Sequence, residues 1–166
     1  PTLLVCPTSL LGNWERELAK FAPTLPLFVH HGNNRERLPK AFKPHTLVLT
    51  TYGVVRREED TFAARAWGMI VVDEAQAIKN AGSVQAKTIR KLRGGFRLAL
   101  TGTPIENRLT ELWAIMSAGL PGYLGTESQF KERFATPIEK YRDPDAAQEL
   151  RQRIGPFILR RLKTDR

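Results

Sequence analysis

The 166-residue chain is 42% hydrophobic and 26% charged, which is typical of a folded globular domain and excludes a disordered or fibrous protein. Its 26 lysines and arginines outnumber its 17 aspartates and glutamates, and the formal net charge of +9 favours a polyanionic partner such as nucleic acid, with a solvated basic surface as the alternative. No apolar run approaches the roughly 18 residues of a membrane span, so no membrane partner is expected.

Five short apolar runs rich in Val, Leu and Ile are predicted as strands. They are residues 2–6, 27–30, 46–50, 69–72 and 97–101. They alternate with stretches of helical periodicity, which is the order of βα units, and continuous apolar runs suit strands buried on both faces. The sequence therefore predicts an α/β fold with a mainly parallel sheet. Because the first strand begins at once, we expect the lobe to be truncated at its N-terminus.

Between the first two strands, Leu11, Trp14, Leu18 and Phe21 recur at helical spacing and predict an amphipathic helix docked on the sheet. Trp14 lies on its apolar face, as Trp113 does on a later helix. We interpret both as core aromatics rather than as platforms for a ligand.

Ser83 is a candidate N-cap for a helix that runs through Leu92 and ends at Gly94 and Gly95. The face of this helix that is predicted to be buried carries Val84, Thr88, Ile89 and Leu92. A further helix is marked by Leu109, Leu112, Trp113 and Met116, and is closed by Gly119 and Pro121.

Beyond Gly122 the chain becomes more charged, and Pro137 and Pro144 are expected to break it into short helices. Their apolar positions are Phe130, Phe134, Leu150 and Ile154. We therefore divide the chain into a lobe over residues 1–122 and a helical C-terminal appendage and connector over residues 123–166.

The sharpest feature for chemistry is the run from residue 69 to residue 76, in which four apolar residues are followed at once by Asp73 and Glu74. A buried parallel strand carries such acids to the carboxyl edge of the sheet, where α/β proteins bind ligands. There Asp73 can hold Mg²⁺ through its water shell, and Glu74 can orient or deprotonate an attacking water. A strand that simply ends in two surface acids is the alternative.

Two other predicted strands also end in turns rich in hydroxyl groups. Thr101, Gly102 and Thr103 follow one strand, where the glycine permits a tight turn and the hydroxyls can reach a neighbouring strand end. Thr8 and Ser9 follow the first strand and enter a helix whose free N–H groups suit a phosphate. Simple turn formation in the first case, and helix capping by Ser9 in the second, are the alternatives.

These strand ends, in this order, resemble those of superfamily-two helicase-like motors, and specifically of SWI/SNF-type DNA translocases of the microbial branch. The resemblance is carried by PTSLLGNWERELAKF, LTTYGVV, VVDEAQAIKN, LALTGTPIENRLTELWAI and FILRRLKTD. Residues 1–14 resemble motif Ia, 47–52 motif Ib, 73–76 the DExx box and 100–104 motif III. Residues 157–165 resemble the arginine-bearing connector at the exit of the first lobe.

The resemblance implies a RecA-like three-layer sandwich, one of two lobes that hydrolyse ATP at their interface and track along double-stranded DNA. Asp73 and Glu74 inherit the metal-binding and catalytic roles, while Thr101, Gly102 and Thr103 couple nucleotide state to DNA grip. Contacts to backbone phosphates, which carry no sequence information, fall on Pro7, Thr8, Ser9, Asn13, Thr51 and Arg108. The implied partners are the second lobe and a DNA-bound protein complex, and the implied cofactors are ATP and Mg²⁺.

Two departures from the family pattern matter. The sequence contains no G-x-x-x-x-G-K-[ST] loop, so the cradle for ATP phosphates is missing and we expect the fragment alone to be inactive. Gln76 stands where family members often carry His, although its amide can still bridge to a phosphate or to Thr101. We therefore expect Gln76 and Thr101 to lie close together.

Two other functions stay open from the sequence, a strand-separating helicase of the same superfamily and a non-catalytic module that binds DNA or protein. The single cysteine, Cys6, cannot form an internal disulfide, which fits a reducing compartment. We expect a nucleoid-associated cytoplasmic protein if the source is microbial and a nuclear one if it is eukaryotic.

Overall fold

The computed structural model describes residues 1–103 and 108–161. Within them, five strands form one sheet in the order β2-β3-β1-β4-β5, and all four neighbouring pairs are parallel. The strands are β1 Thr2–Cys6, β2 Leu27–His30, β3 Leu47–Thr51, β4 Ala66–Val72 and β5 Arg93–Ala99. The predicted α/β fold with a parallel sheet is confirmed, and β4 and β5 begin earlier than expected.

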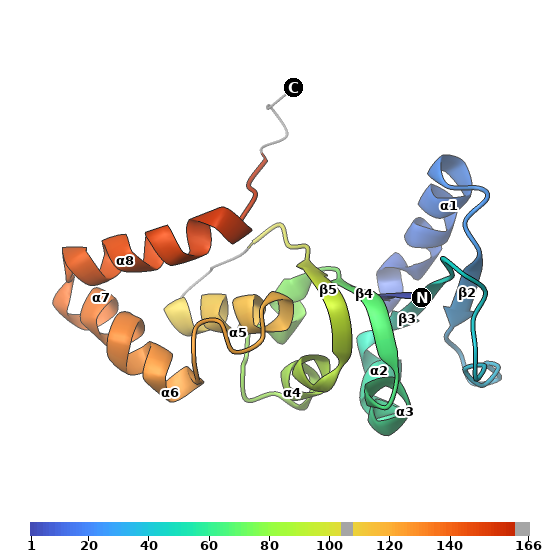
Figure 1. The fold of residues 1–166 in the computed structure, drawn as a ribbon, viewed down its shortest axis with the longest axis horizontal. Coiled ribbons are helices and arrows are strands. Elements are labelled where there is room, and N and C mark those ends of the chain that lie inside the picture. Colours follow the sequence, from blue (N-terminus) through green and yellow to red (C-terminus); the bar gives the residue numbers. More distant parts are fainter. Residues whose placement is uncertain (104–107, 162–166) are drawn as a thin grey trace.

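Helices cover both faces of the sheet, which gives three layers (Figure 1). On one face lies α1 (Leu11–Phe21), whose Leu11 packs with Leu4, Cys6 and Leu49 of the strands. The other face is covered by α2 (Tyr52–Arg57), α3 (Glu59–Ala63), α4 (Val84–Lys91) and α5 (Leu109–Gly119). The sheet is therefore the central layer, as the predicted architecture requires.

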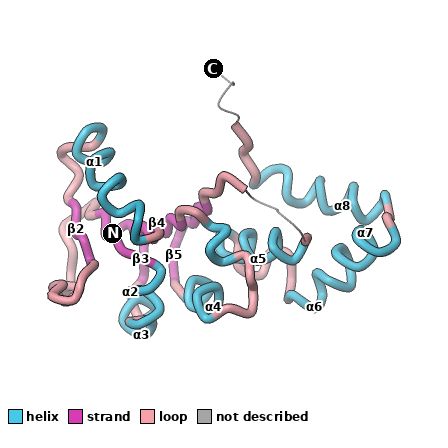
Figure 2. Tube along the Cα trace, turned by 180° about the vertical axis from the view of Figure 1, so that it is seen from behind, coloured by secondary structure: helices cyan, strands magenta, loops and turns pink. Residues whose placement is uncertain are grey.

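The C-terminal helices lie beside α5, at the end of the molecule opposite β2 (Figure 2). They are α6 (Glu127–Phe130), the π-helical segment η3 (Lys131–Ala135), α7 (Thr136–Tyr141) and α8 (Pro144–Ile154), followed by a short 3₁₀ turn, η4 (Gly155–Phe157). Phe130, Phe134 and Leu150 share an apolar cluster with Leu112 and Trp113 of α5. The appendage thus packs on the last helix of the lobe, and the division at residue 122 stays a prediction.

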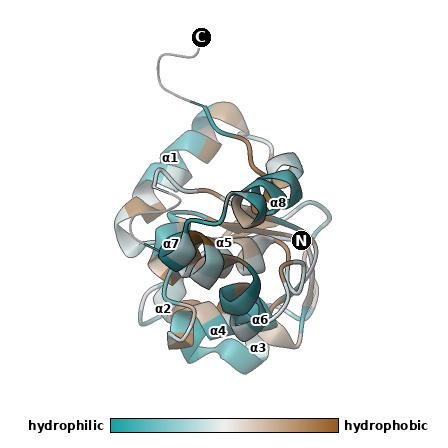
Figure 3. Ribbon diagram, turned by 90° about the vertical axis from the view of Figure 1, so that its left-hand side faces the viewer, coloured by the Kyte–Doolittle hydropathy of each residue, from teal (hydrophilic) through white to brown (hydrophobic). Residues whose placement is uncertain are grey.

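Hydropathy follows this layering, since the strands are mostly apolar while α6 and α7 are largely hydrophilic on the side that faces the viewer in Figure 3. Among the described helices, none is long and apolar enough to cross a membrane.

The prediction that Gly94 and Gly95 end α4 is wrong, because both glycines lie inside β5. The helix ends at Lys91 with Leu92 as its C-cap, and Gly94 pairs with Trp67 of β4. A Cβ on Gly94 would lie 2.7 Å from Cδ1 and 2.9 Å from Cγ1 of Ile70. The glycine is needed for close packing of a strand, which a sequence pattern does not distinguish from a helix stop.

Pro137 was also predicted wrongly, because it does not break the helix. The chain stays helical from α6 through η3 into α7, and Pro137 lies in the first turn of α7. Proline lacks the N–H that would bond four residues back, and the widened π-helical turn just before it accommodates that loss. Pro144, in contrast, does begin a new helix, α8.

Two residues assigned to buried helix faces are exposed, Phe21 at 70% and Val84 at 59%. Both occupy a terminal position of their helix, where the apolar face of the helix extends beyond the elements on which it packs. The remaining predicted core positions of α4, namely Thr88, Ile89 and Leu92, are buried.

Alanine substitutions at two glycines should change stability in opposite directions. Gly94→Ala forces a methyl group against buried Ile70 and should lower the free energy of unfolding by about 1–3 kcal/mol. Gly12→Ala, in α1 with open space around the new Cβ, should raise it by about 0.5–1 kcal/mol. Urea unfolding followed by circular dichroism measures both, and effects of the same sign would contradict this account of Gly94.

Candidate functional site

Three chemically distinctive turns meet at the carboxyl edge of the sheet, because β1, β4 and β5 are consecutive neighbours. Backbone bonds continue the ladder past the strand ends, from Asp73 N to Val5 O and from Leu100 N to Val72 O, both at 2.8 Å. Ala75 N then donates to Leu100 O, also at 2.8 Å. The acids after β4 are therefore held between the turns that follow β1 and β5, as the sequence predicted.

Donors from separate elements hold Asp73. Its Oδ2 accepts a hydrogen bond from Nε1 of Trp14 on α1, and its Oδ1 accepts one from the backbone N of Glu74, both at 2.8 Å. The hydroxyl of Tyr52, at the start of α2, donates to the backbone carbonyl of Asp73 at 2.6 Å. Both the side chain and the main chain of Asp73 are therefore fixed.

The bond from Trp14 to Asp73 is a contact of the candidate site that the sequence did not predict. Trp14 packs against Leu4, Cys6 and Leu11, as the core interpretation predicted, but its ring nitrogen also reaches the acid. The chemistry of tryptophan could have indicated this contact, because the indole N–H of a largely buried tryptophan usually needs an acceptor.

Glu74 adopts the left-handed backbone conformation, with φ 50° and ψ 53°. Such a conformation costs a non-glycine residue about 1–3 kcal/mol and is concentrated at functional sites. It turns the chain sharply from β4 into the 3₁₀ helix η2 (Ala75–Ile78). Two adjacent acids thereby face different surroundings.

A continuous chain of hydrogen bonds runs from Glu74 to the turn after β5. Gln76 Nε2 donates to Glu74 Oε2, Thr101 Oγ1 donates to Gln76 Oε1 at 2.7 Å, and Thr103 N donates to Thr101 Oγ1 at 3.2 Å. The predicted proximity of Gln76 and Thr101 is confirmed. The amide of Gln76 uses its donor on one side and its acceptor on the other, so it bridges the two strand ends.

The surroundings of Asp73 alter two neighbouring ionisable groups. Burial, with the negative charge of Asp73 as the second cause, raises the pKa of the Cys6 thiol to about 11. The same two causes, burial first, raise the pKa of Tyr52 well above its ordinary value. Tyr52 therefore stays protonated and continues to donate to Asp73.

The residues predicted to contact DNA divide into exposed and buried groups. Thr8 and Ser9 are exposed and Pro7 is half-buried in or beside the 3₁₀ turn η1 (Thr8–Leu10), and Asn13 is exposed in the first turn of α1 that follows. Ser9 does not cap α1, since no side chain caps that helix. Thr51 is only 3% exposed and its hydroxyl accepts the capping bond from Val54 N of α2, so it is not presented at the surface.

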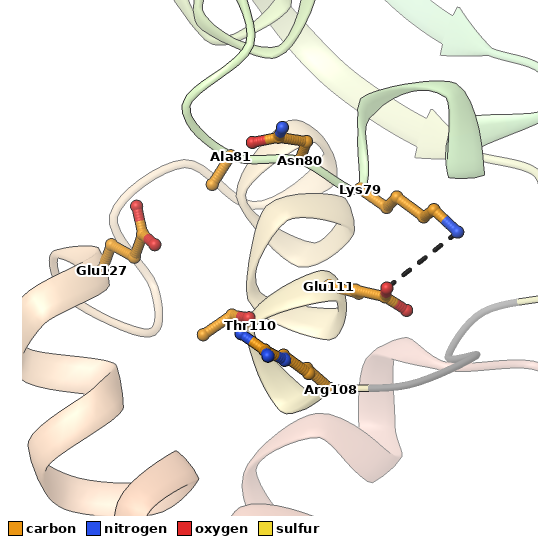
Figure 4. Close-up of a pocket in the computed structure, with 7 residues that line it drawn as sticks. All are labelled: Lys79, Asn80, Ala81, Arg108, Thr110, Glu111 and Glu127. Atoms are coloured by element: carbon orange, nitrogen blue, oxygen red, sulfur yellow. Dashed lines mark ion pairs between the residues drawn. The ribbon is translucent and has the colours of Figure 1, made fainter.

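Arg108, the remaining predicted DNA contact, is exposed at the N-cap of α5 and lines a hollow of about 230 Å³. The hollow lies between the segment after η2, the start of α5 and the start of α6 (Figure 4). Its other lining residues are Lys79, Asn80, Ala81, Thr110, Glu111 and Glu127. Lys79 Nζ lies 4.0 Å from Glu111 Oε1, so the hollow carries charges of both signs.

No group of three or more His, Cys, Asp or Glu side chains suited to a metal occurs in residues 1–103 and 108–161. A cage made only of protein ligands is therefore not formed there. Asp73 instead fits the pattern of Mg²⁺, which is held by one or two carboxylates together with substrate phosphates and water.

The whole chain, residues 1–166, matches the SNF2-related domain. The chain belongs to this SNF2 family. The family predicted from the motifs is therefore confirmed, although residues 104–107 and 162–165, which carry part of that resemblance, lie outside the described residues.

Among its SNF2 relatives is the putative ATP-dependent helicase/translocase YwqA of Bacillus subtilis, which is 45% identical over 99% of this chain and 18% of its own length. The TATA-binding protein-associated factor mot1 of Schizosaccharomyces pombe is 38% identical over 99% of this chain and 9% of its own length. The chain thus spans less than a fifth of these relatives.

Solved SNF2 structures share the fold. The Sulfolobus solfataricus SWI2/SNF2 ATPase core in complex with dsDNA has a TM-score of 0.89 at 47% identity, over 99% of this chain and 34% of that one. The same organism's SWI2/SNF2 ATPase core domain has a TM-score of 0.84 at 46% identity, over 100% of this chain and 34% of that one. The chain is thus a RecA-like α/β unit that corresponds to about a third of such a core.

Cys6 should be almost unreactive in the folded chain. With a pKa of about 11, only about one thiol in a thousand is ionised at pH 8, and the thiolate is the reactive form. Reaction with Ellman's reagent should therefore be roughly 200-fold slower than in urea, from ionisation alone. Absorbance at pH 8 with and without urea measures this, and similar rates in both conditions would show that Cys6 is not buried beside Asp73 in the folded chain.

Proposed function

We propose that this chain is part of the ATP-hydrolysing motor of a translocase that moves along double-stranded DNA. The observation that carries the proposal is the pair of adjacent acids at the sheet edge, with Glu74 joined through Gln76 to Thr101. Support also comes from relatives named as ATP-dependent helicases or translocases and from a structural neighbour solved with dsDNA.

Asp73 is suited to holding Mg²⁺ because both of its oxygens are oriented by donors and a carboxylate offers about four acceptor positions in all. When bound with ATP, Mg²⁺ would neutralise negative charge on the phosphates. The bonds from Trp14 and Glu74 N therefore leave acceptor positions free for the metal or its water shell.

Glu74 is the residue we assign to the attacking water. Gln76 occupies one of its carboxylate oxygens, while further acceptor positions can receive a hydrogen from water. A correctly positioned base of this kind contributes roughly a hundredfold or more to the rate. The loop that grips the ATP phosphates, and the arginines of a second RecA-like lobe, would come from other parts of the whole protein.

Duplex DNA would bind through its phosphates at the turn between β1 and α1. Thr8, Ser9 and Asn13 are exposed there, with Pro7 beside them, and Arg108 is a more distant candidate in the sequence. Hydroxyl and amide groups that contact phosphates position a protein without reading sequence. The net charge of +9 supports binding to DNA phosphates. A DNA-bound protein complex would be the target that the motor displaces.

Glu74→Gln in the whole protein should leave ATP binding intact and reduce DNA-stimulated hydrolysis by roughly a hundredfold or more. Phosphate release with and without duplex DNA, beside binding of a fluorescent ATP analogue, separates the two effects. Glu132→Gln, an exposed acid on η3, is the matched control and should change neither. A wild-type protein that binds DNA without hydrolysing ATP would instead support a binding module.

Gln76→Ala and Thr101→Val should uncouple the motor rather than stop it. Both break the bridge between Glu74 and the turn after β5, so translocation should fall roughly tenfold while most ATP turnover remains. Triplex displacement measures translocation and the phosphate assay measures ATP turnover, so the two together give the ratio of translocation to hydrolysis. Gln148→Ala and Thr136→Val, at exposed positions of α8 and α7, are the matched controls. Equal loss of both activities, or of neither, would reject the coupling role.

A further inference from the structure

The bond between Trp14 and Asp73 joins two regions that are 59 residues apart in the sequence. Trp14 lies in the first turns of α1, directly after Asn13 and close to the exposed Thr8 and Ser9. Asp73 is the acid best placed to hold Mg²⁺. One hydrogen bond therefore connects the surface proposed to bind DNA with the carboxylate proposed to bind the metal.

The chemistry of this bond fixes its direction. An indole N–H only donates and an ionised carboxylate only accepts, so no exchange of roles is available. The N···O distance of 2.8 Å is normal for an N–H···O hydrogen bond, and a bond to an ionised acceptor is about twice as strong as one between neutral groups. The contact is therefore a strong and unambiguous restraint on Oδ2.

Packing and hydrogen bonds restrain both ends of the bond. Trp14, a residue of α1, packs on the sheet against the cluster that contains Leu4, Cys6 and Leu11. At the other end, Glu74 N restrains Oδ1 and Tyr52 restrains the backbone of Asp73. Of these three restraints, only the one from Trp14 comes from the helix that follows the candidate DNA-binding turn.

We infer that Trp14 is a positioning residue that couples DNA binding at the start of α1 to metal binding by Asp73. DNA that holds the turn before α1 also holds the indole N–H on Oδ2 and keeps the carboxylate in the orientation that the metal requires. Coupling of this kind is reciprocal, so the metal–nucleotide complex tightens DNA binding by the same factor. The inference rests on the proposed function and is separate from the Gln76 bridge, which acts on Glu74.

The test is made in the whole protein with Trp14→Phe, which keeps an aromatic ring and removes the N–H. The half-saturating Mg²⁺ concentration is measured for binding of a fluorescent, non-hydrolysable ATP analogue, with and without duplex DNA. In the wild type, DNA should lower this concentration. In the variant it should rise roughly 10- to 100-fold, as for loss of an outer partner of a metal ligand, and DNA should no longer change it.

The matched control is Trp113→Phe, which also deletes one indole bond, from Nε1 to Gly125 O at 3.1 Å, but in the contact of α5 with the appendage. It should leave the Mg²⁺ dependence unchanged. If Trp14→Phe lowers the unfolding temperature, 3-benzothienylalanine at position 14 replaces N–H by sulfur within the same ring shape. This variant removes the hydrogen bond while it keeps the packing of the ring.

A Mg²⁺ dependence that both Trp14 variants leave unchanged would overturn the inference, and so would a rise with the effect of DNA intact. Neither result touches the proposed function, provided that the wild type hydrolyses ATP when DNA is added. A wild type without such hydrolysis would instead reject the proposed function itself.

Discussion

The parallel register of β1, β4 and β5 is the constraint on which the rest of the site depends. Val72 pairs with Val5 on one side and with Ala99 on the other, so three strands end at one level. Side chains alternate along a strand, and a slip of one residue in β4 would turn Asp73 to the opposite face of the sheet. Gly94 of β5 pairs with Trp67 of β4, and its lack of a Cβ leaves room for Ile70 in this register.

The same alternation explains how Asp73 meets Trp14. Ile70 and Val72 pack into the core on the side of α2 to α5, whereas Val71 packs on the side of α1. Continuing the pattern by one residue places Asp73 on the face of α1, where Trp14 is packed. The contact follows from the period of the strand and from the need of a partly buried indole N–H for an acceptor.

Local patterns predicted the strands, α1 and α5, because buried runs and helical periods are properties of short segments. The meeting of Gln76 with Thr101 was predicted from the expectation that the carboxyl ends of their two strands are neighbours at one site. Non-local packing determined the rest. Gly94 is explained only by Ile70 beneath it, and Thr51, which lies where a phosphate contact was expected, is buried as the cap of α2. The bond from Trp14 needed both the strand alternation and the helix position, neither of which a motif supplies.

The left-handed backbone at Glu74 allows two adjacent acids to have different partners. An extended residue there would continue β4 and would not turn the chain into η2. With φ at 50°, the chain instead folds into η2, and Gln76 lies where its amide joins Glu74 to Thr101. Asp73 is thereby held by the helix after β1, and Glu74 is linked to the turn after β5. This conformation is strained, and a strained residue persists only where its neighbours are fixed. The backbone bonds from Asp73 N to Val5 O and from Ala75 N to Leu100 O fix the residues on either side of Glu74.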